Sequence, residues 1–214
     1  MRRLASGERA DVTDGRGTVA ECIVSGTGQD MLELAVHARR TEPEPDPRIV
    51  VVQAIPKGDR GELAVEIMTE VGVDVVVPWS AERCVAKWRA DRADKALARW
   101  RATAREAAKQ SRRAWFPAVT GAADIRDVAR RVAAASLALL LDPEAPLLLA
   151  STGLPGGGDI VLVVGPEGGV SPDERAALTA AGAVRARLGP SVLRASSAGA
   201  VAASLVLSHC GRWG

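Results

Sequence analysis

The 214-residue sequence contains no apolar run long enough to cross a membrane. One of its longest apolar stretches, residues 133–141, is far shorter than the roughly 20 residues that a membrane-spanning helix requires. The basic N-terminal residues are not followed by an apolar segment, so a secretory signal peptide is not expected. These absences predict a cytoplasmic protein that does not contact a membrane.

Metal ligands and disulfide partners are scarce. The three cysteines lie far apart without a CxxC pair, and only two histidines occur, His37 and His209. A structural zinc site or a disulfide framework needs more ligands at closer spacing. The sequence therefore predicts neither of them, and no metal site is expected.

Several common catalytic motifs are also absent. The sequence has no GxSxG segment, which argues against an α/β-hydrolase. Ser208 and His209 are neighbours without an evident orienting acid, so a nucleophile–base pair is not expected there. No GxGxxG or Walker segment occurs, so the usual dinucleotide and nucleoside triphosphate loops are not predicted.

Positive charge is concentrated in one segment. Residues 83–113 contain 11 lysine or arginine residues and 3 acids, a net charge of +8, whereas the rest of the chain has 17 basic and 23 acidic residues, a net charge of −6. Such a segment on an otherwise acidic protein is typical of a polyanion-binding surface, and nucleic acid is one candidate. A solvated helix face would produce the same pattern, and the charge alone does not separate the two.

The chain divides into two regions at the proline-rich, acidic segment 42–47, because repeated proline favours an extended linker. Before it, alternating segments predict short β-strands at residues 8–12, 18–24 and 31–36, with turns at 14–15 and 26–28. Three strands are few for an independent barrel. We therefore place the domains at residues 1–41 and 48–214.

After the linker, continuous apolar runs alternate with segments of helical periodicity. The runs at 49–52, 73–77, 137–141 and 160–164 are typical of strands that are buried on both faces. Helices are predicted at 62–71, 91–110, 125–135, 171–181 and 195–208. This alternation predicts an α/β domain with a largely parallel sheet.

The segment 165–169, Gly-Pro-Glu-Gly-Gly, follows a predicted buried strand and precedes a helix. Ser171 is a good N-cap, and Glu174 completes a capping box with it. Strand–loop–helix units of this kind commonly bind ligands in α/β proteins. The acidic Glu167 argues against a phosphate and favours a cationic or hydroxyl-rich ligand, although a tight glycine turn without a ligand explains the same residues.

A second Gly/Pro loop, residues 188–194, precedes the last predicted helix. That helix is rich in alanine, glycine and serine, which allows close packing within the chain or across a dimer. Arg194 lies where the loop meets the helix. Taken by itself, a surface ion pair is the better explanation of this residue.

Together the two loops resemble the RsmE family. These are SPOUT-class methyltransferases that modify N3 of one uridine in 16S ribosomal RNA, using S-adenosylmethionine. The resemblance is carried by GPEGG at 165–169 with SxxE after it, and by LGPxVLR at 188–194. It extends to GV at 72–73, SxERC at 80–84 and QSxR at 110–113, and covers about residues 4–210.

The resemblance implies a C-terminal SPOUT α/β domain with a trefoil knot, a homodimer, and a PUA-like RNA-binding barrel at the N-terminus. Family members usually have about another half barrel before the residues that match the start of this chain, so an incomplete barrel is expected. By position, the S-adenosylmethionine site would comprise Leu141, Asp142, Pro143, Gly165, Pro166, Glu167, Gly168, Gly169, Leu188, Gly189 and Leu193, with Arg194 beside it.

Uracil N3 is protonated at neutral pH, so the enzyme has to favour the uracil anion. Arg194 is our candidate for stabilising that charge. The family often has Leu-Arg-Thr-Glu-Thr-Ala where this chain has Leu-Arg-Ala-Ser-Ser-Ala, so no carboxylate can act as the base at that position. Solvent, Ser196 and Ser197 remain the alternatives for the base.

The predicted partner is 16S ribosomal RNA or the small ribosomal subunit. The expected contacts to the RNA backbone are Lys57, Arg60, Arg83, Lys87, Arg112 and Arg113. Trp88 and Trp115 lie among these residues and could stack on bases, but core packing is the expected role of at least one of them. Two alternatives are a SPOUT enzyme acting on another RNA position, such as a ribose hydroxyl, and a non-catalytic RNA- or ribosome-binding protein.

Overall fold

The computed structural model describes residues 4–88 and 90–213. The chain forms two compact units. The first comprises Met1–Glu44 and Arg112–Phe116, and the second comprises Pro45–Ser111 and Pro117–Gly214. No helix of the described residues is long and apolar enough to cross a membrane.

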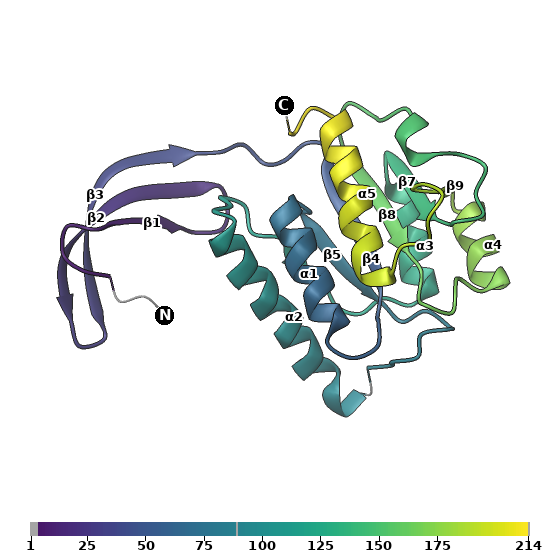
Figure 1. Cartoon of the computed structure of the whole chain (residues 1–214), viewed down its shortest axis with the longest axis horizontal. Coiled ribbons are helices and arrows are strands. Elements are labelled where there is room, and N and C mark those ends of the chain that lie inside the picture. Colours follow the sequence, from purple (N-terminus) through teal and green to yellow (C-terminus); the bar gives the residue numbers. More distant parts are fainter. Residues whose placement is uncertain (1–3, 89, 214) are drawn as a thin grey trace. The chain divides into compact units, whose positions relative to one another are not determined.

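The first unit contains a three-stranded antiparallel sheet, formed by β1 (Arg9–Thr13), β2 (Thr18–Gly28) and β3 (Met31–Thr41) in that order (Figure 1). The predicted turn at residues 26–28 is wrong, because these residues belong to β2. The chain turns instead at Gln29–Asp30, where Asp30 has a φ of 61°. Aspartate tolerates this left-handed conformation better than most residues, so the strands continue further than the glycines suggested.

Residues 112–116 complete the first unit by pairing with the β1–β2 connection. The Phe116 N–H donates to the Gly15 carbonyl at 2.9 Å, and the Gly17 N–H donates to the Ala114 carbonyl at 3.0 Å. Gly17 has a φ of 97°, and a Cβ there would lie 2.7 Å from the Trp115 ring. Glycine is therefore required for the close approach of these segments.

The second unit is built on a six-stranded parallel sheet in the order β6-β5-β4-β8-β7-β9. Its strands are β4 (Arg48–Ala54), β5 (Val75–Trp79), β6 (Ala118–Val119), β7 (Leu137–Leu141), β8 (Asp159–Val164) and β9 (Val184–Ala186). Its helices are α1 (Arg60–Val71), α2 (Ala90–Gln110), α3 (Ile125–Ala134), α4 (Pro172–Ala180) and α5 (Ala195–His209), with a short 3-10 turn at Leu149–Ser151. The predicted α/β class is confirmed, whereas the short β6 and β9 were not predicted.

Both faces of this sheet are covered, as the continuous apolar runs predicted. Alternate residues of the central strands β4 and β8 pack into two separate cores: Val51 and Leu162 face α1, α2 and α5, while Val52 and Val163 face α3 and α4. Figure 1 shows α1, α2 and α5 on one side of the sheet. Because all strands are parallel, their C-terminal ends meet at one edge of the sheet.

Candidate functional site

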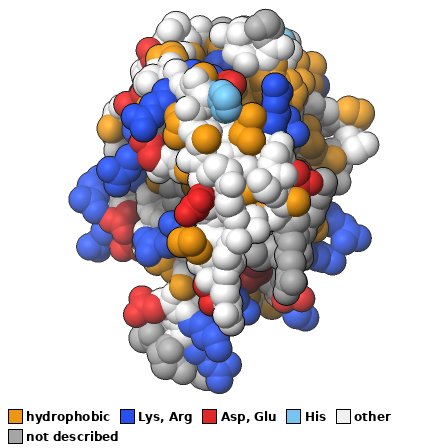
Figure 2. Space-filling model, turned by 90° about the vertical axis from the view of Figure 1, so that its left-hand side faces the viewer, with side chains coloured by type: hydrophobic (Ala, Val, Ile, Leu, Met, Phe, Trp, Pro, Cys, Tyr) orange, Lys and Arg blue, Asp and Glu red, His pale blue; other side chains and the backbone are white. Residues whose placement is uncertain are grey.

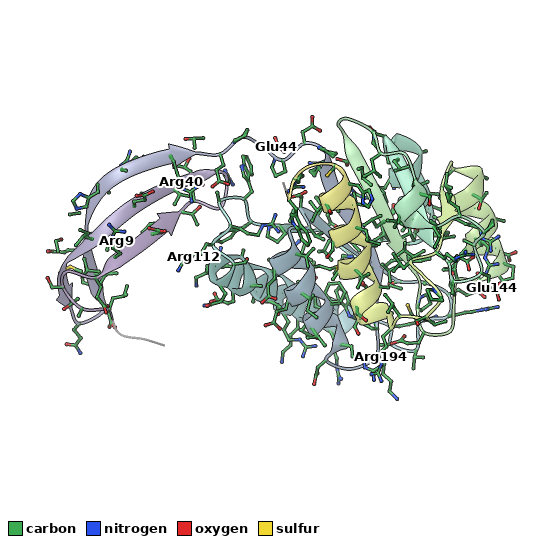
Figure 3. All side chains as sticks on the ribbon, turned by 45° about the horizontal axis from the view of Figure 1, so that its top comes forward. Arg9, Arg40, Glu44, Arg112, Glu144 and Arg194 are labelled. Carbon is green, nitrogen blue, oxygen red and sulfur yellow. The ribbon has the colours of Figure 1, made fainter. Side chains whose placement is uncertain are left out.

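A cavity of about 460 Å³ lies at the C-terminal edge of the parallel sheet. Three segments that are distant in sequence form most of it: residues 140–144 at and after the end of β7, residues 164–170 at and after the end of β8, and residues 186–195, which connect β9 to α5. Figure 3 labels Glu144 in the first segment and Arg194 in the third. Crevices at this edge are the usual ligand sites of open α/β sheets.

Most residues that we predicted for a cofactor site are brought together here. Gly168 is the exception, because it does not line the cavity. The lining includes Leu141, Asp142, Pro143, Gly165, Pro166, Glu167, Gly169, Leu188, Gly189, Leu193 and Arg194.

The loop after β8 is shaped by close backbone contacts. A Cβ on Gly165 would lie 2.7 Å from Val170 Cγ2, and Gly169 has a φ of 74°. The Gly169 N–H donates to the Pro166 carbonyl at 2.9 Å and closes the turn. Gly168 instead packs against Arg83, whose Cβ would lie 3.3 Å from an added Cβ. Gly165 and Gly169 therefore shape the cavity wall, whereas Gly168 allows the loop to pack tightly against Arg83 behind that wall.

The helix after this loop starts with the predicted capping box. Ser171 Oγ accepts the Glu174 N–H at 3.3 Å, and Glu174 Oε2 accepts the Ser171 N–H at 3.2 Å. Glu174 is buried, and its other oxygen accepts the Glu82 N–H at 2.7 Å. This acid thus fixes the start of α4 and the segment after β5 at the same time.

Asp142 is the buried charge of the cavity, with 7% of its surface exposed. Its carboxylate accepts the Glu144 N–H at 2.9 Å and Arg185 Nε at 2.8 Å, and Arg175 Nε lies 3.8 Å away. Burial raises the pKa of this carboxyl, but the hydrogen bonds from Glu144 and Arg185 outweigh burial and leave the pKa below its ordinary value. Asp142 is therefore ionised and holds the segment after β7 in place.

The third segment is anchored by Arg187, which also lines the cavity. Its backbone N–H donates to the Leu147 carbonyl at 2.9 Å, and its Nη1 donates to the Ala145 carbonyl at 3.0 Å. Arg194 is the N-cap residue of α5 and is exposed. The lining therefore combines apolar side chains with charges of both signs. This suits a ligand that carries an apolar ring together with a positively and a negatively charged group.

The two serines weighed as bases lie just beyond the cavity. Ser196 is 7% exposed, and Ser197 Oγ donates to the Arg194 carbonyl at 3.3 Å. Neither is among the residues that line the cavity. Within residues 4–88 and 90–213, no group of three His, Cys, Asp or Glu side chains is arranged to hold a metal ion.

The predicted RNA contacts separate into two groups. Lys57, Arg60, Arg83 and Lys87 follow the C-terminal ends of β4 and β5, at the same sheet edge as the cavity. Lys57 N–H lies 3.5 Å from Glu167 Oε1, and Arg83 Nη1 lies 3.4 Å from the Gly168 carbonyl. Arg112 and Arg113 follow α2 and belong to the first unit. Trp115 also belongs to that unit, where its Nε1 donates to the Glu42 carbonyl at 3.0 Å.

Comparison with known proteins identifies the family. A family model described as an RNA methyltransferase domain matches residues 42–207. Ribosomal RNA small subunit methyltransferase E of Mycobacterium tuberculosis is 46% identical over 217 residues, which cover 100% of this chain and 83% of that protein. The chain belongs to the RsmE family of RNA methyltransferases. The RsmE protein of Bacillus subtilis is 27% identical, with 96% of this chain and 84% of that protein covered.

Solved structures agree with this membership. The crystal structure of RsmE from Neisseria gonorrhoeae bound to S-adenosyl methionine superposes with a TM-score of 0.86 at 27% identity, covering 96% of this chain and 85% of that chain. A methyltransferase from Legionella pneumophila in complex with the cofactor SAM gives a TM-score of 0.84 at 25% identity, with the same coverage. The RsmE resemblance and the α/β fold are thus confirmed.

Three charged lining residues were missed by sequence reasoning: Glu144, Arg175 and Arg187. Glu144 and Arg187 are immediate neighbours of segments that we had singled out, so a wider window around each loop would have included them. Arg175 comes from the first turn of α4, and its Nε is buried without a hydrogen-bond partner among the described residues. The role of Arg175 beside Asp142 becomes visible only in the folded structure, where its Nε lies 3.8 Å from the Asp142 carboxylate.

Proposed function

We propose that this chain transfers a methyl group from S-adenosylmethionine to N3 of a uridine in 16S ribosomal RNA. The observation that supports this most directly is the single cavity in which the two RsmE-like loops meet the segment after β7. Relatives named ribosomal RNA small subunit methyltransferase E match the chain along its length. A SPOUT enzyme acting on another RNA position would share this cavity, so the product decides between them.

The cavity fits S-adenosylmethionine. Its volume of about 460 Å³ lies in the range of small-molecule sites. Leu141, Leu188 and Leu193 offer an apolar wall for the adenine ring. Glu144 and Glu167 can balance the ammonium and sulfonium charges, and Arg187 can bind the carboxylate. When bound, the cofactor supplies a methyl group on a positively charged sulfur.

The chain's task is to present a deprotonated uracil to that methyl group. The N3–H bond breaks, the N3 lone pair forms the new C–N bond, and the C–S bond breaks to leave a neutral thioether. Arg194, exposed at the cavity wall, stabilises the negative charge on the uracil oxygens. Because neither Ser196 nor Ser197 lines the cavity, we assign the proton to solvent. Alignment of donor and acceptor supplies much of the remaining rate.

The remaining expectations complete the proposal. Residues 1–41 would form the PUA-like RNA-binding domain, 42–47 the linker, and 48–214 a knotted SPOUT domain that pairs as a homodimer. Within the chain, the small residues of α5 allow close packing, because a Cβ on Gly199 would lie 3.0 Å from Met68 Sδ and 3.2 Å from Val51 Cγ1. RNA would bind the basic residues named above. Action on ribosomal subunits would place the protein in the cytoplasm.

The deciding experiment is methyl transfer from labelled S-adenosylmethionine to unmodified small ribosomal subunits, with the product nucleoside identified by mass spectrometry. We expect 3-methyluridine. Another methylated nucleoside would indicate a different SPOUT reaction, and subunit binding without transfer would indicate a non-catalytic RNA-binding protein.

The role of Arg194 is tested by Arg194→Ala in the same assay. Loss of one electrostatic stabiliser should lower kcat by about 10²–10³-fold, while cofactor affinity measured by calorimetry stays close to that of the wild type. Arg126→Ala is the matched control, because Arg126 is an exposed arginine on α3 outside the cavity. Full turnover by Arg194→Ala would show that the assignment is wrong.

A further inference from the structure

A second cavity, of about 720 Å³, lies in the same unit and at the same sheet edge. The segment after β4, the segment before α2 and the first turns of α2 form it. Its charged and aromatic lining residues are Asp59, Lys87, Trp88, Arg92, Lys95 and Arg99. The proposed methyl transfer uses the first cavity and leaves this one without a role.

The second cavity is strongly basic. Lys87, Arg92, Lys95 and Arg99 line it, and Asp59 is the acid among the lining residues. The three cations of α2 recur at intervals of three and four residues, which places them on one face of the helix. Figure 2 shows blue Lys and Arg side chains at the lower end of the molecule, where Figure 1 places the start of α2. This composition fits a phosphate-bearing ligand.

Three of these cations, Lys87, Lys95 and Arg99, are weakly neutralised by the part of the protein that the structure describes. Arg99 pairs with Glu62 at 3.4 Å, but 62% of the Arg99 side chain is exposed, so the pair is weak. For Lys87 and Lys95, the described part of the chain provides no ion pair. The N-cap Asp59 makes no side-chain hydrogen bond to the start of α1, so the positive end of that helix dipole is not capped by this side chain.

Trp88 adds an aromatic surface to the basic lining. It is half-buried and packs edge-to-face with Trp100, with ring centroids 5.2 Å apart and an interplanar angle of 84°. Trp100 is itself held tightly, because it is 2% exposed and contacts Gly61 so closely that a Cβ there would lie 2.7 Å away. A fixed aromatic ring beside several cations is the usual arrangement for binding a nucleotide in single-stranded RNA.

The two cavities are neighbours through the sheet. Strand β4, which leads to the second cavity, pairs directly with β8, which leads to the first. The loops beyond these strands meet where the Lys57 N–H lies 3.5 Å from Glu167 Oε1. A chain of nucleotides that follows this edge would therefore reach both cavities.

We infer that the second cavity binds a nucleotide of the RNA substrate that flanks the methylated uridine, with its base against Trp88 and its phosphate among Lys87, Lys95 and Arg99. This inference rests on the proposed function and extends it, because it specifies how the enzyme holds RNA beside the reacting base. Such a contact would contribute to binding the substrate and leave the chemical step unchanged.

The first test is the double variant Lys87→Gln/Lys95→Gln in methyl transfer to unmodified small subunits. We expect KM for the subunit to rise at least about tenfold, with kcat and cofactor affinity near wild-type values, and the slope of log affinity against log salt to fall by about two. The matched control is Arg105→Gln/Lys109→Gln, which removes two charges from α2 outside the cavity. Equal effects of the two double variants would overturn the inference.

The second test reads RNA contact without methyl transfer. Subunits are crosslinked to the wild-type protein by ultraviolet light, and nucleotide adducts are mapped by mass spectrometry. We expect an adduct at Trp88, whereas Trp213, which is 54% exposed and outside the cavity, is the internal control. Adducts confined to other tryptophans would overturn the inference. Crosslinking at Trp88 without methyl transfer would support RNA binding in the second cavity and refute the proposed methyltransferase function.

Discussion

Replacing Asp142 by asparagine should lower stability by about 1–2 kcal/mol at neutral pH. A hydrogen bond to a charged group contributes about 1.5–3 kcal/mol, and Asp142 accepts one from Arg185 at 2.8 Å. Because the side chains of Arg185 and Arg175 are 33% and 37% exposed, screening by solvent reduces this contribution to about 1–2 kcal/mol. For a chain of this size the melting temperature should fall by roughly 3–6 °C.

The effect should depend on pH in a defined direction. The pKa of Asp142 lies below its ordinary value of 3.8 in the folded protein, so the unfolded chain takes up a proton first as the pH falls. The stability from this ion pair is therefore fully present above the ordinary pKa and is lost as the pH falls through the lower, folded pKa. The difference between the wild type and Asp142→Asn should be constant from about pH 7 to pH 5 and shrink below about pH 4.

Urea unfolding of both proteins across this pH range measures the difference directly. Glu144→Gln is the control, because Glu144 is an exposed acid two residues away and its charge has no ion pair among the described residues. It should change the free energy of unfolding by less than about 0.5 kcal/mol. The reasoning would be refuted if Glu144→Gln cost as much as Asp142→Asn, or if the cost of Asp142→Asn did not fall at acid pH.

Three further substitutions test other parts of the second unit. Gly165→Ala should weaken S-adenosylmethionine binding about tenfold by calorimetry, because the new Cβ would lie 2.7 Å from Val170 Cγ2 and displace the cavity wall. Ser171→Ala should lower stability in chemical denaturation by about 1 kcal/mol, because Glu174 N–H loses its cap. Leu162→Ala, in the fully buried centre of β8, should cost about 2–5 kcal/mol in the same assay.

The main elements of the second unit were predictable because burial on both faces leaves a clear pattern. The apolar run at residues 160–164 became β8 (Asp159–Val164), and the run at 137–141 became β7 with the same bounds. The start of α4 was predictable from its capping residues, because Ser171 and Glu174 act locally. Each of these signals depends on neighbours within a few residues of the chain. A single sequence was therefore enough to predict these elements.

Features that depend on distant partners were not predictable in this way. Strands β6 and β9 have only two and three residues, so they carry no periodicity, and they exist because β5 and β7 offer an edge for pairing. The same holds for Arg175, whose Nε lies 3.8 Å from Asp142 Oδ2 only because the chain folds α4 back toward the residues that follow β7. The candidate cofactor residues were found through the family motif and not through chemistry alone.

The basic segment 83–113 shows how far charge in the sequence can lead. Its charge predicted a polyanion-binding surface, and the RNA contacts proposed above would be that surface. The sequence could not show that the basic residues of this segment belong to two separate groups. In the structure Lys87, Lys95 and Arg99 converge on one cavity, whereas Arg112 and Arg113 belong to the other compact unit. The 21-residue helix α2 separates the two groups along the chain. If RNA uses both, the two groups serve different parts of the substrate, and removing charges from each should weaken RNA binding additively, because sites without shared partners do not couple.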